Sequence, residues 1–200
     1  MAMRIKSHWF KPGREKSTRE IAWSVAFVIW RIGDNALKNT RKADFDIAVG
    51  PQYFAFLDEF LLFLIQVADR IAYRKLQPEV RAEFTGALAN RVAETMAENR
   101  SRLLGGDYAG HKQGFIDELN SRGDDYAEFG YDDNGPDYGF MRYLGYRIGE
   151  IMGEKDAPWV VDQMISIEAP EAVKMLEKTI SDLYETGPRK TRSRASVSGD

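Results

Sequence analysis

The stretch GPQYFAFLDEFLLFLIQVADRIAYRKL, residues 50–76, decides how this chain folds. It holds an unbroken apolar run from residue 60 to residue 65, and consecutive residues of a helix point in every direction around its axis. Such a helix has to be covered on nearly all sides, because a helix that is apolar all round is a buried one. The sequence therefore predicts a central helix over about 51–76, enclosed by other helices.

Capping and helix-breaking residues set the limits of the surrounding helices. Ser17 and Glu20 have the spacing of a capping box, in which each side chain satisfies a free backbone N–H of the other residue. Proline opens a helix without losing a needed hydrogen bond, and glycine pairs end one. These signals predict an all-α bundle of five to six helices, with segments at 17–39, 78–104, 111–121, 137–154, 158–167 and 170–186.

The apolar positions of these segments recur at helical spacing and give an expected core. Some of its members belong to the central helix, and each of the others lies on the face of its own helix that is expected to turn towards it. The expected core residues are Ile21, Val25, Phe27, Ile29, Phe56, Phe60, Leu61, Leu64, Ile71, Phe84, Leu88, Val92, Leu144, Ile148, Leu176 and Ile180.

Composition divides the chain into three parts. Residues 1–16 form a basic arm, residues 17–187 the helical domain, and residues 188–200 a basic tail that we expect to be disordered. Within the domain, residues 105–136 are rich in Gly, Asp and Tyr, and we expect an acidic loop there around the short helix 111–121. A chain of 200 residues is long enough for one domain with a sizeable core.

Overall charge and cysteine content exclude several classes of function. The net charge is −3, so no global field attracts nucleic acid, and there is no cysteine for a disulfide, a thiolate metal site or a cysteine nucleophile. The basic N-terminus lacks the apolar stretch of a secretory signal, and no segment reaches the length of a membrane span. We therefore expect a soluble, cytoplasmic protein that contacts no membrane.

Two features indicate a contact surface. Gly145, Gly149 and Gly153 recur every four residues on one helix face, where each costs about 1 kcal/mol relative to alanine. The missing side chains allow close approach of a helix of the same chain, of a second subunit or of a ligand. The first long helix carries a second apolar stripe, Trp23, Phe27 and Trp30, which either other helices or a homodimer would cover.

Carboxylates on the second and third helices offer one chemical alternative. Asp58, Glu59 and Asp69, with Glu79 or Glu83, could bind Mg²⁺ between neighbouring helices, since that ion takes oxygen ligands. This layout is similar in outline to all-α nucleotide pyrophosphohydrolases. The chain departs from their pattern, because in place of a glutamate-rich motif its first helix offers only Glu20 and Asp34. The competing interpretation puts Asp58 and Glu59 on a solvated face and pairs Asp69 with an arginine.

Three functional hypotheses follow. The leading one is a non-enzymatic helical protein that acts by protein–protein association, above all with a second copy of itself, with no cofactor and no metal. The second is a Mg²⁺-dependent hydrolase of nucleotides that uses the carboxylates just named. The third, which we do not favour, is non-specific nucleic-acid binding through the basic ends, because no nucleic-acid-binding motif accompanies them.

Overall fold

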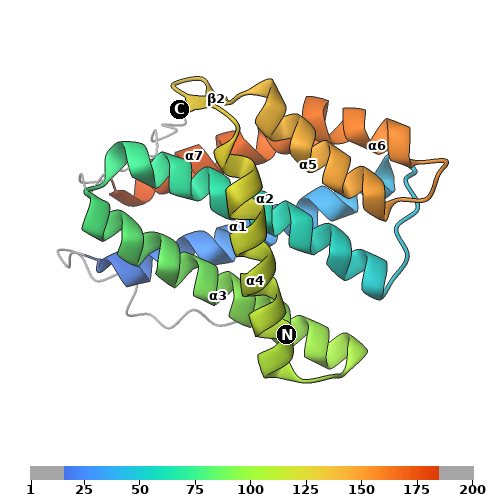
Figure 1. Ribbon diagram of the computed structural model, residues 1–200, viewed down its shortest axis with the longest axis horizontal. Helices are drawn as coiled ribbons and strands as arrows, with labels where there is room; N and C mark the ends of the chain where they lie inside the picture. The colour runs from blue at the N-terminus through green and yellow to red at the C-terminus, as the bar shows by residue number, and fades with distance from the viewer. Residues whose placement is uncertain (1–15, 185–200) are drawn as a thin grey trace, which may run out of the picture.

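Helix α2 (Pro51–Lys75) lies at the centre of the molecule, between the other long helices (Figure 1). The computed structural model describes residues 16–184. Every residue from 56 to 65 is buried, including the whole apolar run. The prediction of a central apolar helix is confirmed.

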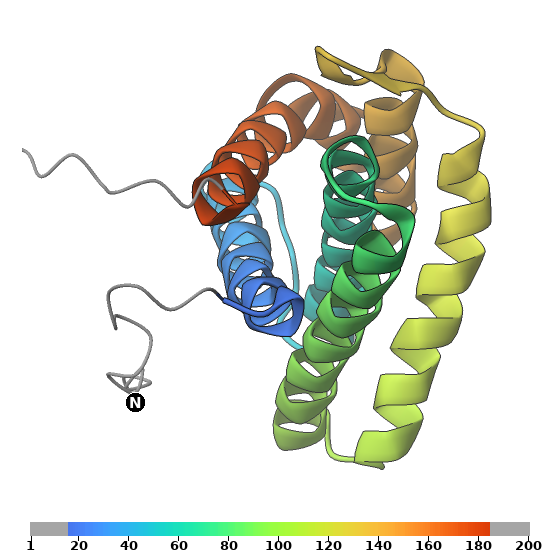
Figure 2. The ribbon, with the colours of Figure 1, turned by 90° about the vertical axis from the view of Figure 1, so that its left-hand side faces the viewer.

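Five helices pack directly against α2: α1 (Thr18–Lys42), α3 (Pro78–Leu104), α4 (Tyr108–Ala127), α5 (Tyr138–Ile151) and α7 (Ala169–Tyr184). In Figure 2, α1 and α7 cover one side of α2, and α4 and α5 cover the opposite side. The molecule is an all-α helical bundle, as the sequence predicts. Within residues 16–184 no helix is long and apolar enough to span a bilayer.

The expected capping residues begin the helices. Glu20 accepts the backbone N–H of Ser17 at 3.0 Å, and the Ser17 hydroxyl accepts the N–H of Glu20 at 3.2 Å, so the capping box is present. Proline occupies the first turn of both α2 and α3. Asp107 and Asp137 cap α4 and α5 through their side chains, which the sequence analysis did not assign.

The expected acidic loop is largely helix. Helix α4 covers 20 residues, where we expected a helix over 111–121 and a loop from 123. Its buried stripe is Phe115, Leu119, Arg122 and Tyr126, which keeps helical spacing. Arg122 lies in the middle of this buried stripe and has glycine and acidic residues near it in the sequence. The apolar spacing typical of a helix is therefore hard to recognise from the sequence alone.

Helices α6 (Ala157–Gln163) and α7 form one continuous rod, joined by a π-helical turn over Met164–Glu168. We expected a helix to open at Pro170; α7 begins one residue earlier, at Ala169, but it follows the π turn without a break. Proline has no N–H, and its ring clashes with the carbonyl four residues earlier in a regular α-helix. The wider π turn, in which the N–H of Ala169 donates to the carbonyl of Met164, accommodates the proline without a break.

A two-residue hairpin connects α4 to α5. Strands β1 (Tyr131–Asp132) and β2 (Gly135–Pro136) pair antiparallel, and Gly135 has a φ of 98°, which glycine adopts without strain.

The hydrophobic core matches the expectation except at one position. Phe27 is 42% exposed, whereas the other predicted core residues are buried. The basic arm, apart from Lys16, and the tail 188–200 lie outside the described residues.

Candidate functional site

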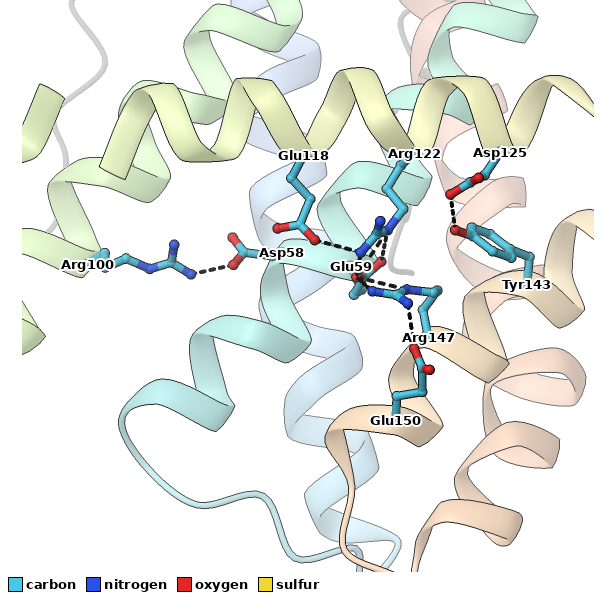
Figure 3. A network of polar contacts seen from close by, with 9 residues as sticks. All are labelled: Asp58, Glu59, Arg100, Glu118, Arg122, Asp125, Tyr143, Arg147 and Glu150. Atoms are coloured by element: carbon cyan, nitrogen blue, oxygen red, sulfur yellow. Dashed lines mark hydrogen bonds and ion pairs between the residues drawn. The ribbon is translucent and has the colours of Figure 1, made fainter. Parts of the chain in front are cut away.

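Two adjacent acids interrupt the apolar middle of α2, and both are buried. Asp58 is 8% exposed and Glu59 is 5% exposed, so the expectation of a solvated face at these residues is wrong. A buried charge is stable only when partners neutralise it. Figure 3 shows that the two side chains point to different arginines, which come from three neighbouring helices.

Glu59 binds two guanidinium groups. Arg122 of α4 donates from Nε to both carboxylate oxygens, at 3.2 and 3.0 Å, and from Nη2 to Oε1 at 2.6 Å. Arg147 of α5 adds Nε and Nη2 donors to the same Oε1 at 3.2 and 3.1 Å. Both arginines also reach a second carboxylate, Glu118 and Glu150 respectively. We call this set, together with Asp58 and Arg100, the α2 ion-pair network.

The network joins α2 to α4 and α5 at a point where few other polar groups are buried. The hydrogen bond from Arg122 to Glu59 is the main cause that raises the pKa of Arg122, so this guanidinium keeps its charge. Bidentate pairing fixes the relative orientation of the two helices as well as their distance. The first role of the network is therefore to hold α4 and α5 in register on α2.

Asp58 differs from its neighbour. Its Oδ2 accepts a hydrogen bond from Nη2 of Arg100 on α3, while its Oδ1 is buried and has no hydrogen-bond partner in the protein. Burial raises the pKa of Asp58 from its ordinary value of 3.8 to about 7, against the opposing charge and hydrogen bond of Arg100. The nearby carboxylates Glu118 and Glu59 add to the rise. The site thus favours the protonated form of Asp58 more than solvent does.

The other candidate carboxylates lie elsewhere. Asp69 is 11 residues further along α2 than Asp58, which is about 16 Å along the helix axis. It accepts hydrogen bonds from Arg81 and Thr85 of α3, and the expected pairing with an arginine is confirmed. Glu79 and Glu83 are exposed on α3. In residues 16–184 no group of three or more acidic or histidine side chains is placed to hold a metal ion.

The second apolar stripe of α1 reaches the surface. Trp23 is 51% exposed and Phe27 is 42% exposed, and Trp30 is half-buried. Helices α1 and α3 lie side by side in both views (Figures 1 and 2). Beside Trp23, between these helices, a groove of about 400 Å³ is lined by Arg19, Ala82, Glu83, Gly86, Ala87, Asn90, Arg91 and Glu94. We call Trp23, Phe27 and this groove the α1–α3 face.

The glycine ladder lies between helices of the same chain. A Cβ atom at Gly145 would meet the backbone oxygen and a methyl group of Val161 on α6 at 3.2 Å, and one at Gly149 would meet Val161 at 3.3 Å. Both glycines are buried. Gly153 follows the end of α5 and has no atom within 4 Å of such a Cβ, so the predicted three-residue ladder is two residues long. A subunit contact through these glycines stays a prediction.

Sequence reasoning missed the basic half of the ion-pair network. Arg100, Arg122 and Arg147 stand on three helices and are brought together only by the packing around α2. The available signal was on the acidic side, because two acids inside an otherwise apolar helix require buried partners. Glu118 and Arg122, four residues apart, were a second signal.

The fold and these two sites define an all-α bundle with a buried ion-pair network and an exposed aromatic face. Comparison of the chain with protein-family models, with curated proteins and with solved structures gave no match.

Proposed function

We propose that this protein acts by association with a second copy of itself through the α1–α3 face. The observation that supports this most is the pair Trp23 and Phe27, one turn apart on α1 and each about half exposed. Large aromatic side chains gathered beside a groove are typical of binding surfaces, whose central contacts are often aromatic. The lack of cysteine supports a reducing compartment, so the proposal places the association in the cytoplasm.

The charges of the groove favour an identical partner. Arg19 and Arg91 stand with Glu83 and Glu94 along the same surface, so its formal charge sums to zero. In a two-fold dimer the same patch meets itself, and a patch of one sign would repel its copy. Arg91 and Glu94 pair with each other within the chain, and Glu94 also binds Lys112. We therefore expect Arg19 of one copy to face Glu83 of the other, which aligns the two chains.

The floor of the groove suits a large side chain. On the α3 side its lining includes the small residues Ala82, Gly86 and Ala87, and a Cβ atom at Gly86 would meet no atom within 4 Å. An aromatic ring from the second copy can therefore approach the backbone of α3 closely. We infer that Trp23 of the second copy is the occupant, because Trp23 lines the same groove and is 51% exposed, and a two-fold dimer brings the same patch of both chains together.

The test is the molecular mass in solution of the full chain and of two matched variants. Trp23→Ala removes the proposed anchor, and Trp159→Ala removes a tryptophan of α6 that is 69% exposed and lies outside the face. Light scattering should give a dimer mass for the unchanged chain and for Trp159→Ala, and a monomer mass for Trp23→Ala. Circular dichroism confirms that all three fold alike. Equal masses for the two variants would overturn the assignment of the face.

A further inference from the structure

Asp58 and Asp69 offer a comparison within one helix. Both stand on α2, and both pair with an arginine of α3. Asp69 uses both oxygens: Oδ1 accepts from Nε of Arg81 at 2.9 Å and from the Thr85 hydroxyl at 2.7 Å, and Oδ2 accepts from Nη2 of Arg81 at 2.5 Å. Asp58 uses Oδ2 alone. A buried carboxylate oxygen without a donor favours the protonated form, because the charged form loses much more hydration energy on burial than the neutral form.

The charged groups around Asp58 come from every helix of the network. Arg100 of α3 is the favourable partner, and Glu59 of α2 and Glu118 of α4 are like charges (Figure 3). Arg122 and Arg147 stand nearby but are engaged with Glu59, Glu118 and Glu150. Asp58 is therefore left with one arginine, which favours the charged carboxylate. Its two carboxylate neighbours and its buried oxygen without a donor favour the protonated form.

We propose that Asp58 is a proton-binding site that controls the contact between α2 and the C-terminal half of α3. When the carboxyl holds its proton, Arg100 faces a neutral group. When the proton leaves to solvent, the carboxylate and Arg100 form an ion pair across the two helices, and the charged carboxylate now stands beside Glu118 as well. Proton release thus gives Arg100 a charged partner, but it also leaves a buried carboxylate with one oxygen that has no donor, next to Glu118, so the folded state disfavours the charged form relative to the unfolded chain.

The direction of the Asp58 pKa agrees with this geometry, since burial raises it to about 7 and Arg100 acts in the opposite direction. The proposal is independent of the association proposed above, because none of its groups lines the α1–α3 face. Proton binding at Asp58 is a property beyond the structural role of the α2 ion-pair network. Ion pairs that only hold helices together need no group that titrates near neutrality.

The test is a carboxyl titration by nuclear magnetic resonance on the full chain labelled with ¹³C at the aspartate carboxyl carbon. One resonance should titrate with a midpoint near pH 7, and it should be missing from Asp58→Asn and present in Asp69→Asn. Amide resonances of residues 97–104 on α3 and of residues around Glu118 on α4 should shift over the same pH range. Arg100→Gln should move the midpoint to higher pH, because it removes the group that favours the carboxylate.

Two results would overturn the proposal. One is an Asp58 resonance that titrates only below pH 5, as an ordinary exposed aspartate does. The other is a resonance that titrates near pH 7 while the amides of α3 and α4 stay unchanged, which would separate proton binding from the helix contact. Both readouts come from the unsubstituted chain, with Asp58→Asn used for assignment, so the test does not depend on the folding of Arg100→Gln.

Discussion

Glu59 on α2 and Arg122 on α4, 63 residues apart in the chain, form a buried ion pair with three hydrogen bonds of 2.6 to 3.2 Å. Arg147 of α5 binds the same carboxylate from another helix. One acidic side chain therefore supports the placement of two helices, and a single substitution there affects both contacts.

Glu59→Ala should destabilise the fold by about 3–5 kcal/mol, because it leaves two guanidinium groups in a buried site without their shared carboxylate. Chemical denaturation measures the change in the free energy of unfolding. The control is Asp34→Ala, which removes the partner of Lys38 in a surface pair within α1. That change should stay within about 0.5 kcal/mol. Similar losses for the two variants would contradict a special role for Glu59.

The stability contributed by Asp58 should fall as pH rises from about 5 to about 7.5. Its pKa of about 7 in the folded protein lies above the ordinary value of 3.8, so the folded state holds a proton that the unfolded state has released over this range. The contribution is complete below the unfolded pKa and is lost as pH rises through the folded pKa, with a slope of at most about 1.4 kcal/mol per pH unit for one proton.

The difference in unfolding free energy between the unchanged chain and Asp58→Asn isolates this effect from other titrating groups. That difference should decline with pH over the stated range. The same comparison with Asp69→Asn should not show the decline near neutrality. A difference for Asp58→Asn that stays flat from pH 5 to pH 8 would argue that the proton is not held in the folded state.

Leu64→Ala should reduce stability by about 2–5 kcal/mol, the range for truncating a buried leucine that leaves a cavity. Leu64 is fully buried at the centre of α2. Leu103→Ala is the matched control, since that leucine is mostly exposed near the end of α3 and leaves no cavity. Thermal or denaturant unfolding would show whether α2 is enclosed, and equal small losses at both sites would mean that it is not.

Gly145→Leu should destabilise the fold by about 1–3 kcal/mol, because the added side chain meets both the backbone and the side chain of Val161 and forces α5 and α6 apart. Gly153→Leu supplies the control, since no atom lies within 4 Å of a Cβ there. Denaturant unfolding of both variants measures the difference. A stability loss at Gly153 equal to that at Gly145 would show that close helix packing is not the cause.

The fold was predictable from the sequence where one physical signal dominated. The apolar run in residues 60–65 placed α2 at the centre, and Ser17 with Glu20 placed the start of α1. Prediction failed where tertiary contacts override local signals. Pro170 lies in a helix that follows a π turn without a break. The full length of α4 was missed because Arg122 occupies a buried position that is apolar in an ordinary pattern.

The ion-pair network was predictable only from its acidic side. Asp58 and Glu59 are conspicuous within α2, but nothing local connects them with Arg100 or Arg147, which reach them through packing alone. The α1–α3 face was easier to predict, because Trp23 and Phe27 lie one turn apart on a stripe separate from the buried face of α1. The groove of this face was not predicted. It is lined by small residues of α3, which form a groove only once α3 packs beside α1.

Sedimentation velocity of the unchanged full chain over a wide concentration range tests the proposed self-association most directly. The account predicts a shift, as concentration rises, from the 22.8 kDa of one chain towards twice that mass, and predicts that Trp23→Ala suppresses the shift. A single species of 22.8 kDa at every concentration would contradict the proposal that the α1–α3 face binds a second copy.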